Sequence, residues 1–427
     1  MEATRDIRRM AGLLAARLSE LRLDQVADPR DRRGRRWPLV ALLKTALVAQ
    51  LAGARGTADA EQLTTRFSRT MRRRLGIGRR VPDTTLRDTL CRLDPDETRA
   101  VLHRSVAAAD RRKALVPEHL PYGVVAMDGK SVTLPSWDAD YVQRHVTDGG
   151  KAFGLLRTIT SSLVSARGAP CLDAFPVPAS TNECGAFIAA FAELMRVHGH
   201  RFQLITYDAG AASADNAATV VAAGKDYLFA LKQDQPLKLD TARRKLDGKP
   251  VVSRTEDVLS NRRSVVRTLR LAGVGSLSSG KMPIFWSSTK TIVEVTAETI
   301  VDGEVTAREV HYYLSSIARD ALSPSHWLLV VRRHWGVEND CHKTFDVAFG
   351  EDDHPWITMA PQGTLVALLL RRIAYNLLSL FRSVTQRSDE RRAIPWKQLM
   401  GWVEWTLHAA TDLHVEGLRS RPVAAFR

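Results

Sequence analysis

Two short apolar runs that each end on an aspartate are the feature that most constrains the fold. "YGVVAMD" covers residues 122–128 and "FQLITYD" covers residues 202–208, and each has the length of a buried strand. A buried strand that ends on an acid places a carboxylate at the rim of a sheet, where ligands bind. A single aspartate at such a point is more often a turn former. Asp128 and Asp208 are therefore either two turn residues or two ligands.

The segments around these runs indicate an α/β sheet. Further strands are expected at 153–165, 171–177 and 226–232, with an amphipathic helix at 185–199. Strands that alternate with a helix are typical of α/β folds. Residues 251–315 differ, because β-rich stretches flank an Asp302-Gly303 turn. That pattern predicts antiparallel hairpins.

Residues 1–115 have the pattern of helices. "PLVALLKTALVAQLAGARG" (38–56) is an apolar helix opened by a proline. Within 81–106, two short helices flank "DPDE", with Asp83 or Thr84 as an N-cap. They could form a helix-turn-helix, although helical hairpins are also common in proteins that do not bind DNA.

A chain of 427 residues is too long for one ordinary core. Helices are also expected at 323–345, capped by Ser323 or Ser325, and at 364–381, which is apolar enough to be buried. We expect four parts: a helical DNA-binding domain at 1–115, the first part of an α/β core at 116–250, a β-rich insertion at 251–315, and the second part of the core with C-terminal helices at 316–427.

Composition predicts a globular cytoplasmic protein. Hydrophobic residues make up 44% of the chain and charged residues 26%, which are globular values. No apolar run approaches the ~18 residues that span a bilayer, and the N-terminus lacks a secretory pattern. The four cysteines are far apart and form no CxxC pair, which favours reduced thiols. We therefore expect no membrane association.

The net charge of +15 is concentrated near the N-terminus. Residues 1–113 hold 26 Lys and Arg against 14 Asp and Glu, with clusters such as "RRGRR" (32–36). Such fields attract polyanions, and phosphate backbones are the commonest partner. The alternatives are a solvated basic face or an address signal. Arg35 and Arg36 are candidate DNA contacts.

The stretch "RRHWGVENDCHKTFDVAFGED" (332–352) places His334, Glu338 and His342 four residues apart, on one face of a helix. It could be a zinc site, a polar helix surface or one carboxylate of a larger metal centre. The outer histidines would lie about 12 Å apart along a helix, too far to share one zinc ion. With Asp128 and Asp208, Glu338 completes a ligand set for a pair of Mg²⁺ ions, which can support phosphodiester chemistry.

Several motifs together resemble a known family. They are "VPDTTLRDTLCRLDP" (81–95), "AMDGKSV" (126–132), "STNE" (180–183), "ITYDA" (205–209), "GKDYLFALKQDQ" (224–235), "HYYLSS" (311–316) and "HWGVENDCHKTFDVAFGED" (334–352). In order and spacing they resemble the DDE transposases of bacterial insertion sequences, in the ISAs-type, H-repeat-associated branch.

The resemblance implies an RNase H-like core, an α/β fold, with a β-rich insertion and a preceding all-α domain. Asp128, Asp208 and Glu338 would be the catalytic ligands of Mg²⁺, with Mn²⁺ as an alternative. The implied activity is cleavage of DNA at insertion-sequence ends followed by strand transfer. The implied partners are double-stranded DNA, as terminal inverted repeats and target, and a second copy of the chain on that DNA. The bacterial nucleoid would be its location.

Two other functions remain open from the sequence. A repurposed, non-catalytic DNA-binding protein would not need all three acids, and all three are present. A plain nuclease would use the same acids without an end-recognition domain, against which the basic N-terminal region argues.

Further residues are candidate DNA contacts through the resemblance. Lys130 would pair with Asp128 or a phosphate, or be a plain surface lysine. In this family the β-rich insertion usually opens with the motif His-Gly-Arg-x-Glu. This chain keeps only the arginine of that motif, as Arg262. Trp286 would hold an unstacked base, or simply pack the hairpins.

His334 and His342 would contact phosphate or support the metal centre, or pack within the fold. His334 stands where the broader group has arginine, and Phe345 stands where it has lysine. These departures concern the DNA contacts and leave the three acids intact.

Overall fold

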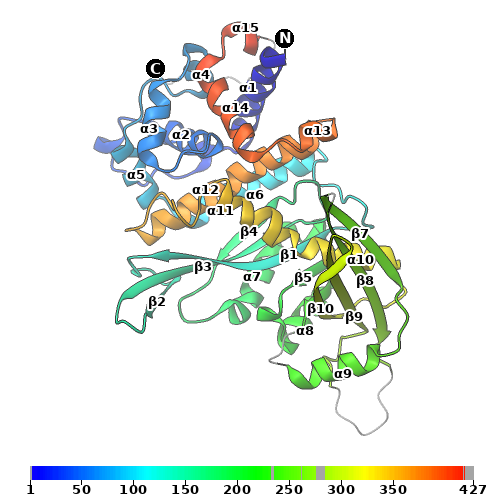
Figure 1. Cartoon of the computed structure of the whole chain (residues 1–427). Helices are drawn as coiled ribbons and strands as arrows, with labels where there is room; N and C mark the ends of the chain where they lie inside the picture. Colours follow the sequence, from blue (N-terminus) through cyan, green and yellow to red (C-terminus); the bar gives the residue numbers. More distant parts are fainter. Residues whose placement is uncertain (1, 232–234, 261, 276–283, 417, 419–427) are drawn as a thin grey trace.

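The computed structural model describes residues 2–231, 235–260, 262–275, 284–416 and 418 (Figure 1). The N-terminal region is helical, as predicted. Its elements are α1 (Glu2–Glu20), η1 (Leu23–Gln25), η2 (Arg32–Gly34), α2 (Leu39–Leu51), α3 (Thr57–Thr65), α4 (Arg69–Leu75), α5 (Asp83–Arg92) and α6 (Pro95–Arg111).

The start of α5 corrects one expectation. Pro82 occupies the N-cap position, and neither Asp83 nor Thr84 does. The backbone N–H of Asp83 donates instead to the carboxylate of Glu61 on α3, at 3.0 Å. A carboxylate from another helix therefore satisfies the donor that a local cap would have taken.

In the described residues the strands form one ten-stranded sheet. The order is β2-β3-β1-β5-β6-β10-β9-β8-β7, and β4 pairs with β3 off this path (Figure 1). The strands are β1 (Val124–Leu134), β2 (Val142–Val146), β3 (Ala152–Ser162), β4 (Cys171–Pro176), β5 (Leu204–Tyr207), β6 (Asp226–Ala230), β7 (Ser253–Ser260), β8 (Arg263–Gly273), β9 (Thr291–Val301) and β10 (Glu304–Ser315).

The centre of this sheet is parallel and its flanks are antiparallel. β5 runs parallel to β1 on one side and to β6 on the other. β10 joins β6 in antiparallel register, and β9, β8 and β7 follow as an antiparallel series. The predicted β-rich segment at 251–315 therefore extends the same sheet.

Helices cover both faces of the parallel centre. On one face lie α7 (Glu183–His198), η3 (Gly199–Arg201), η4 (Ala209–Ala211), α8 (Ala214–Ala222) and α9 (Pro236–Leu246). Phe187 of α7 shares a buried cluster with Tyr207 of β5. On the other face Trp327 of α10 (Pro324–His334) packs with Val124 and Leu204. Successive side chains of a strand point to opposite faces, so this division follows from the strand pattern.

The segment expected as one helix at 323–345 is broken. Ser323 caps α10 by accepting from the backbone of His326 at 3.2 Å, so Ser325 is not the cap. The chain then forms a π-helix, η5 (Val337–His342), followed by α11 (Lys343–Val347). Glu338 is exposed on η5, whereas His334 and His342 are buried, so the three side chains do not form one exposed polar surface.

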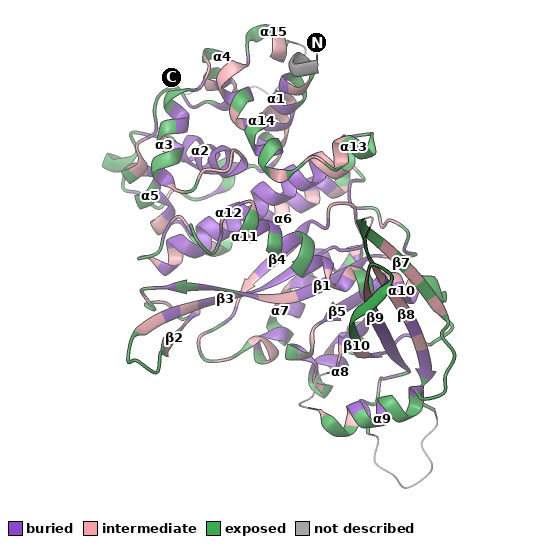
Figure 2. Ribbon diagram, in the orientation of Figure 1, coloured by how far each residue is buried: buried purple, intermediate pink, exposed green. Residues whose placement is uncertain are grey.

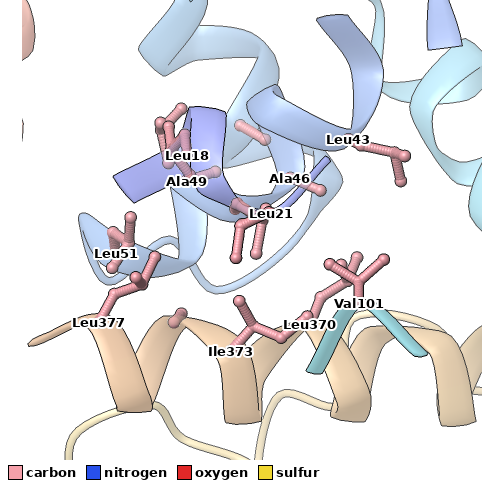
Figure 3. Close-up of a cluster of buried hydrophobic side chains, with 14 of the residues drawn as sticks. Leu18, Leu21, Leu43, Ala46, Ala49, Leu51, Val101, Leu370, Ile373 and Leu377 are labelled. Carbon is pink, nitrogen blue, oxygen red and sulfur yellow. The ribbon is translucent and has the colours of Figure 1, made fainter. Parts of the chain in front are cut away.

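The apolar helix α12 (Pro361–Leu380) is the core of the helical layer. Leu370, Ile373 and Leu377 face leucines and alanines of the N-terminal helices (Figure 3). The helix, with the turn that follows it, is long and apolar enough to cross a membrane, but its 18-residue apolar stretch is entirely buried in the fold (Figure 2). The elements that follow are η6 (Phe381–Thr385), α13 (Asp389–Arg392), α14 (Trp396–Ala409) and α15 (Asp412–Val415).

Because α12 and α14 share a buried cluster with α1, α2 and α5, the N-terminal helices do not have a core of their own. The division of the chain at 115, 250 and 315 stays a prediction.

Candidate active site

The sheet register places Asp128 beside Asp208. β1 and β5 are parallel, and Met127 lies opposite Tyr207. The next residue on each strand is an aspartate, and adjacent strands are about 4.8 Å apart. Asp208 follows the last residue of β5 directly. Asp128, expected to end its strand, lies inside β1, because β1 continues to pair with β3 beyond it.

The Asp128 carboxylate has one hydrogen bond and one close histidine neighbour. Its Oδ1 accepts from the backbone N–H of Gly129 at 2.8 Å. Its Oδ2 lies 3.2 Å from Nδ1 of His342. Nε2 of His342 is buried and has no hydrogen-bond partner among the described residues. His342 therefore orients Asp128 from the η5 side.

Glu338 stands on η5 with its side chain exposed. Partial burial raises the pKa of Glu338, and the Asp128 carboxylate raises it further. His342 opposes this effect and Asp208 adds to it. A carboxyl group whose pKa responds to two other carboxylates shares their electrostatic environment. The charges of Asp128 and Asp208 therefore disfavour the ionised form of Glu338.

His334 is inside the fold, with 4% of its surface exposed. Its Nδ1 lies 3.0 Å from Oγ1 of Thr206 on β5. Burial lowers the pKa of His334 to about 4, so the ring is neutral at pH 7. The contact joins the end of α10 to the strand that leads into Asp208.

Lys130 does not pair with Asp128, which corrects the expectation from sequence. Its Nζ lies 2.6 Å from Oδ1 of Asp346 and 3.2 Å from Oδ1 of Asp352. Lys130 is two residues beyond Asp128 and so shares its face of β1. The segment after η5 covers that face of β1 and supplies Asp346 and Asp352. Lys130 forms ion pairs with both and is buried.

The other predicted DNA contacts lie elsewhere in the fold. Arg262, at the turn between β7 and β8, is exposed and forms a two-bonded ion pair with Asp302. Arg35 and Arg36 are exposed after η2, and Arg35 also donates to the carbonyl of Arg30 at 2.8 Å.

Trp286 is only 8% exposed. Its ring meets those of Tyr227 and Phe229 on β6, with centroids 5.7 and 6.1 Å away. This position favours the packing interpretation, and base stacking by Trp286 stays a prediction.

The acids suit a hard divalent cation by donor type. Carboxylate oxygens are the ligands that Mg²⁺ and Mn²⁺ prefer. A cation beside Asp128, Asp208 and Glu338 would relieve the repulsion that raises the pKa of Glu338. Among the described residues, no three His, Cys, Asp or Glu side chains already converge in metal-binding geometry. The two histidines have separate partners, Thr206 and Asp128, which argues against a zinc site.

Comparisons with known proteins identify the family. Residues 119–377 match the family described as Transposase DDE domain, and residues 21–105 match the family described as DDE_Tnp_1-associated. Two proteins of Escherichia coli (strain K12), YbfL and the H repeat-associated YhhI, are each 26% identical over 283 residues. The alignment covers 64% of this chain and 68% of each relative.

A solved structure of the piggyBac transposase synaptic complex with hairpin DNA is also similar, with a TM-score of 0.45 and 11% identity. The match covers 93% of this chain and 77% of that one.

The DDE match spans more than half of the chain, and the relatives agree with the H-repeat-associated branch. The predicted fold class, an RNase H-like α/β core with a β-rich insertion behind an all-α region, is confirmed. Proteins of this family act on DNA and generally use divalent metal ions. The sheet, its neighbouring acids and the family match lead to one conclusion: the chain belongs to the DDE transposase family.

Proposed function

We propose that this transposase cleaves DNA at the ends of an insertion sequence and transfers the freed strand, using Mg²⁺ held by Asp128, Asp208 and Glu338. The observation that carries the proposal is the register of β1 and β5, which sets two acids side by side. The response of Glu338 to both acids supports it as the third ligand. Mn²⁺ is the alternative metal.

In the proposed reaction, water attacks the phosphodiester at the element's end and frees a 3′-OH. That hydroxyl then attacks target DNA or the opposite strand. When bound, the metal ions would activate the attacking oxygen and stabilise the leaving one. The protein's own part is positional: His342 of η5 lies against the Asp128 carboxylate, and His334 joins α10 to β5.

Lys130 has a structural part in this proposal. By pairing with Asp346 and Asp352 it joins the segment after η5 to β1. Glu338 and Asp128 lie on the two elements joined in this way, so the pairing restrains one carboxylate relative to the other.

The DNA partners follow from charge. Residues 1–113 carry most of the positive charge, which suits binding to the terminal inverted repeats, with Arg35 and Arg36 among the phosphate contacts. Arg262 and Trp286 would act on DNA from the β7–β10 side. We further propose a homodimer on DNA, in the bacterial cytoplasm and associated with the nucleoid.

The test first locates inverted repeats that flank the gene, and then uses the full-length protein with a duplex that carries one of them. Asp128→Asn, Asp208→Asn and Glu338→Gln should each abolish strand cleavage and leave duplex binding largely intact, because the amide keeps the shape and loses the charge. Ca²⁺ should support binding without cleavage, and a zinc chelator should not inhibit.

Two outcomes would contradict the proposal in different ways. Cleavage near the wild-type rate by one variant would remove that residue from the site. Wild-type protein that binds the duplex in Mg²⁺ and Mn²⁺ but never cuts it would favour a repurposed DNA-binding protein.

A further inference from the structure

Gly129, the residue after Asp128, leaves space that a carboxylate fills. A Cβ built on Gly129 would lie 2.1 Å from Oε1 and 2.3 Å from Oε2 of Glu183. Real Cβ atoms do not approach other atoms so closely. The Glu183 carboxylate therefore rests against the backbone of β1, one residue from the first acid of the proposed site.

Glu183 approaches from the face opposite to Glu338. Asp128 meets His342 of η5 on one face of β1, and the next residue along a strand points to the other face. That second face is the one that α7 covers, and Glu183 is the first residue of α7. Glu183 and the Asp128 carboxylate therefore lie on opposite faces of β1.

The electrostatics of a helix N-terminus do not explain why the Glu183 side chain lies over Gly129. Asn182 already caps α7 by accepting from the backbone N–H of Gly185 at 3.0 Å. An acid in the first turn gains its modest electrostatic benefit even when it points into solvent. Glu183 instead extends over a strand at its only position without a side chain.

A second polar group is buried at the same place. Tyr207, just before Asp208, is fully buried, and its hydroxyl has no hydrogen-bond partner among the described residues. Its ring stacks on Phe187 at 5.6 Å, one helical turn beyond Glu183 on α7. A buried donor without a partner here indicates that a further polar ligand belongs in this space.

We propose that Glu183 is a fourth carboxylate ligand of the divalent cation site, acting from the α7 face. The proposal rests on the function proposed above and extends it by one residue. It also gives the "STNE" motif a chemical role: Asn182 begins the helix and Glu183 faces the metal.

The test measures Mn²⁺ binding to full-length protein by calorimetry, in the absence of DNA. Glu183→Gln should weaken Mn²⁺ binding at least tenfold, in the same direction as Asp128→Asn. Glu193→Gln, the same charge change on the same helix, is the matched control and should bind like wild type. Unchanged Mn²⁺ affinity in Glu183→Gln, with a loss in Asp128→Asn, would overturn the fourth ligand alone. Wild-type protein that takes up no Mn²⁺, or an Asp128→Asn variant that binds normally, would overturn both proposals.

A double-mutant cycle separates a ligand from a structural contact. Gly129→Ala should displace the Glu183 carboxylate and weaken Mn²⁺ binding, whereas in the Glu183→Ala background it should have no further effect on that affinity. If the two changes are coupled in thermal stability but not in Mn²⁺ affinity, the contact only packs α7 against β1 and the proposal is wrong.

Discussion

Glu338 and Glu351 belong to one sequence motif but have opposite surroundings. Glu351 is fully buried, and its carboxylate accepts from Arg371 at 3.2 Å and from Nη2 of Arg372 at 2.9 Å. Glu338 is exposed and shares its electrostatic environment with Asp128 and Asp208. The carboxylate of Glu351 is paired with two arginines, whereas the carboxylate of Glu338 lies near two other acids.

This contrast distinguishes a carboxylate that stabilises the fold from one that is available to a ligand. Two arginines of α12 fix Glu351, so the segment that follows η5 is attached to the core helix. Carboxylates that stabilise a fold are paired or hydrogen-bonded, and carboxylates that repel one another are retained for a ligand. The two glutamates should therefore respond in opposite ways when they are changed.

The largest effect is expected from breaking the buried ion pairs. Arg372→Met should lower the free energy of unfolding by about 3–5 kcal/mol, because it leaves Glu351 buried with a partner missing. Urea denaturation measures the change. Glu338→Gln is the comparison and should keep or slightly raise stability, because it removes repulsion. Equal losses in the two variants would show that the contrast is false.

The two glutamates should also differ in acid. Burial alone would raise the pKa of Glu351, but Arg372 and Arg371 outweigh it and lower the pKa to about 2. A lowered carboxyl pKa contributes stability that is present above the ordinary value of 4.5 and is lost as pH falls toward 2. The loss should reach about 3 kcal/mol.

Glu338 has the opposite sign, because its raised pKa makes the folded state bind a proton more readily than the unfolded chain. Urea unfolding at pH 5 and pH 3 measures both effects. Glu351→Gln should be less stable at pH 5 and should lose less stability on acidification than wild type does. Glu338→Gln should lose at least as much as wild type. A wild-type acid response in Glu351→Gln would contradict the assignment.

The smallest effect on stability is expected for the exposed arginine Arg36, which lies outside the protein core. Arg36→Ala should leave stability unchanged and weaken binding to the end duplex. If Arg36 neutralises one phosphate, its removal should reduce the slope of log affinity against log salt by about 0.9. Fluorescence anisotropy across a salt series measures this slope. Mn²⁺ affinity is the control and should not change, and an unaltered slope would remove Arg36 from the DNA interface.

Much of the fold follows from local patterns. Residues 122–128 and 202–208 are apolar runs of strand length, and both form strands of the central sheet. The 364–381 run is largely apolar and becomes the buried helix α12. The period and the burial of a segment are written in its own residues, so these elements could be predicted without knowing their neighbours.

The candidate site was only partly predictable. The acids at 128 and 208 are visible because each ends an apolar run, and Glu338 because of its motif. Their 80-residue separation in sequence does not predict that the two acids are neighbours. They become neighbours because β1 and β5 pair in parallel with Met127 opposite Tyr207. The role proposed for Glu183 was missed for the same reason, although "STNE" was noticed, since nothing local brings it over Gly129.

The sequence by itself determined most of the strands and helices, the acids and the excess of positive charge, but not β2 or the break after α10. The tertiary structure alone decided that Lys130 joins Asp346 and Asp352 and that His334 is buried against Thr206. It also decided the π-helix that carries Glu338, which is exposed there while His334 and His342 are buried. The physical reason is that periodicity acts over a few residues, whereas a side chain's partner depends on the register between segments far apart in the chain.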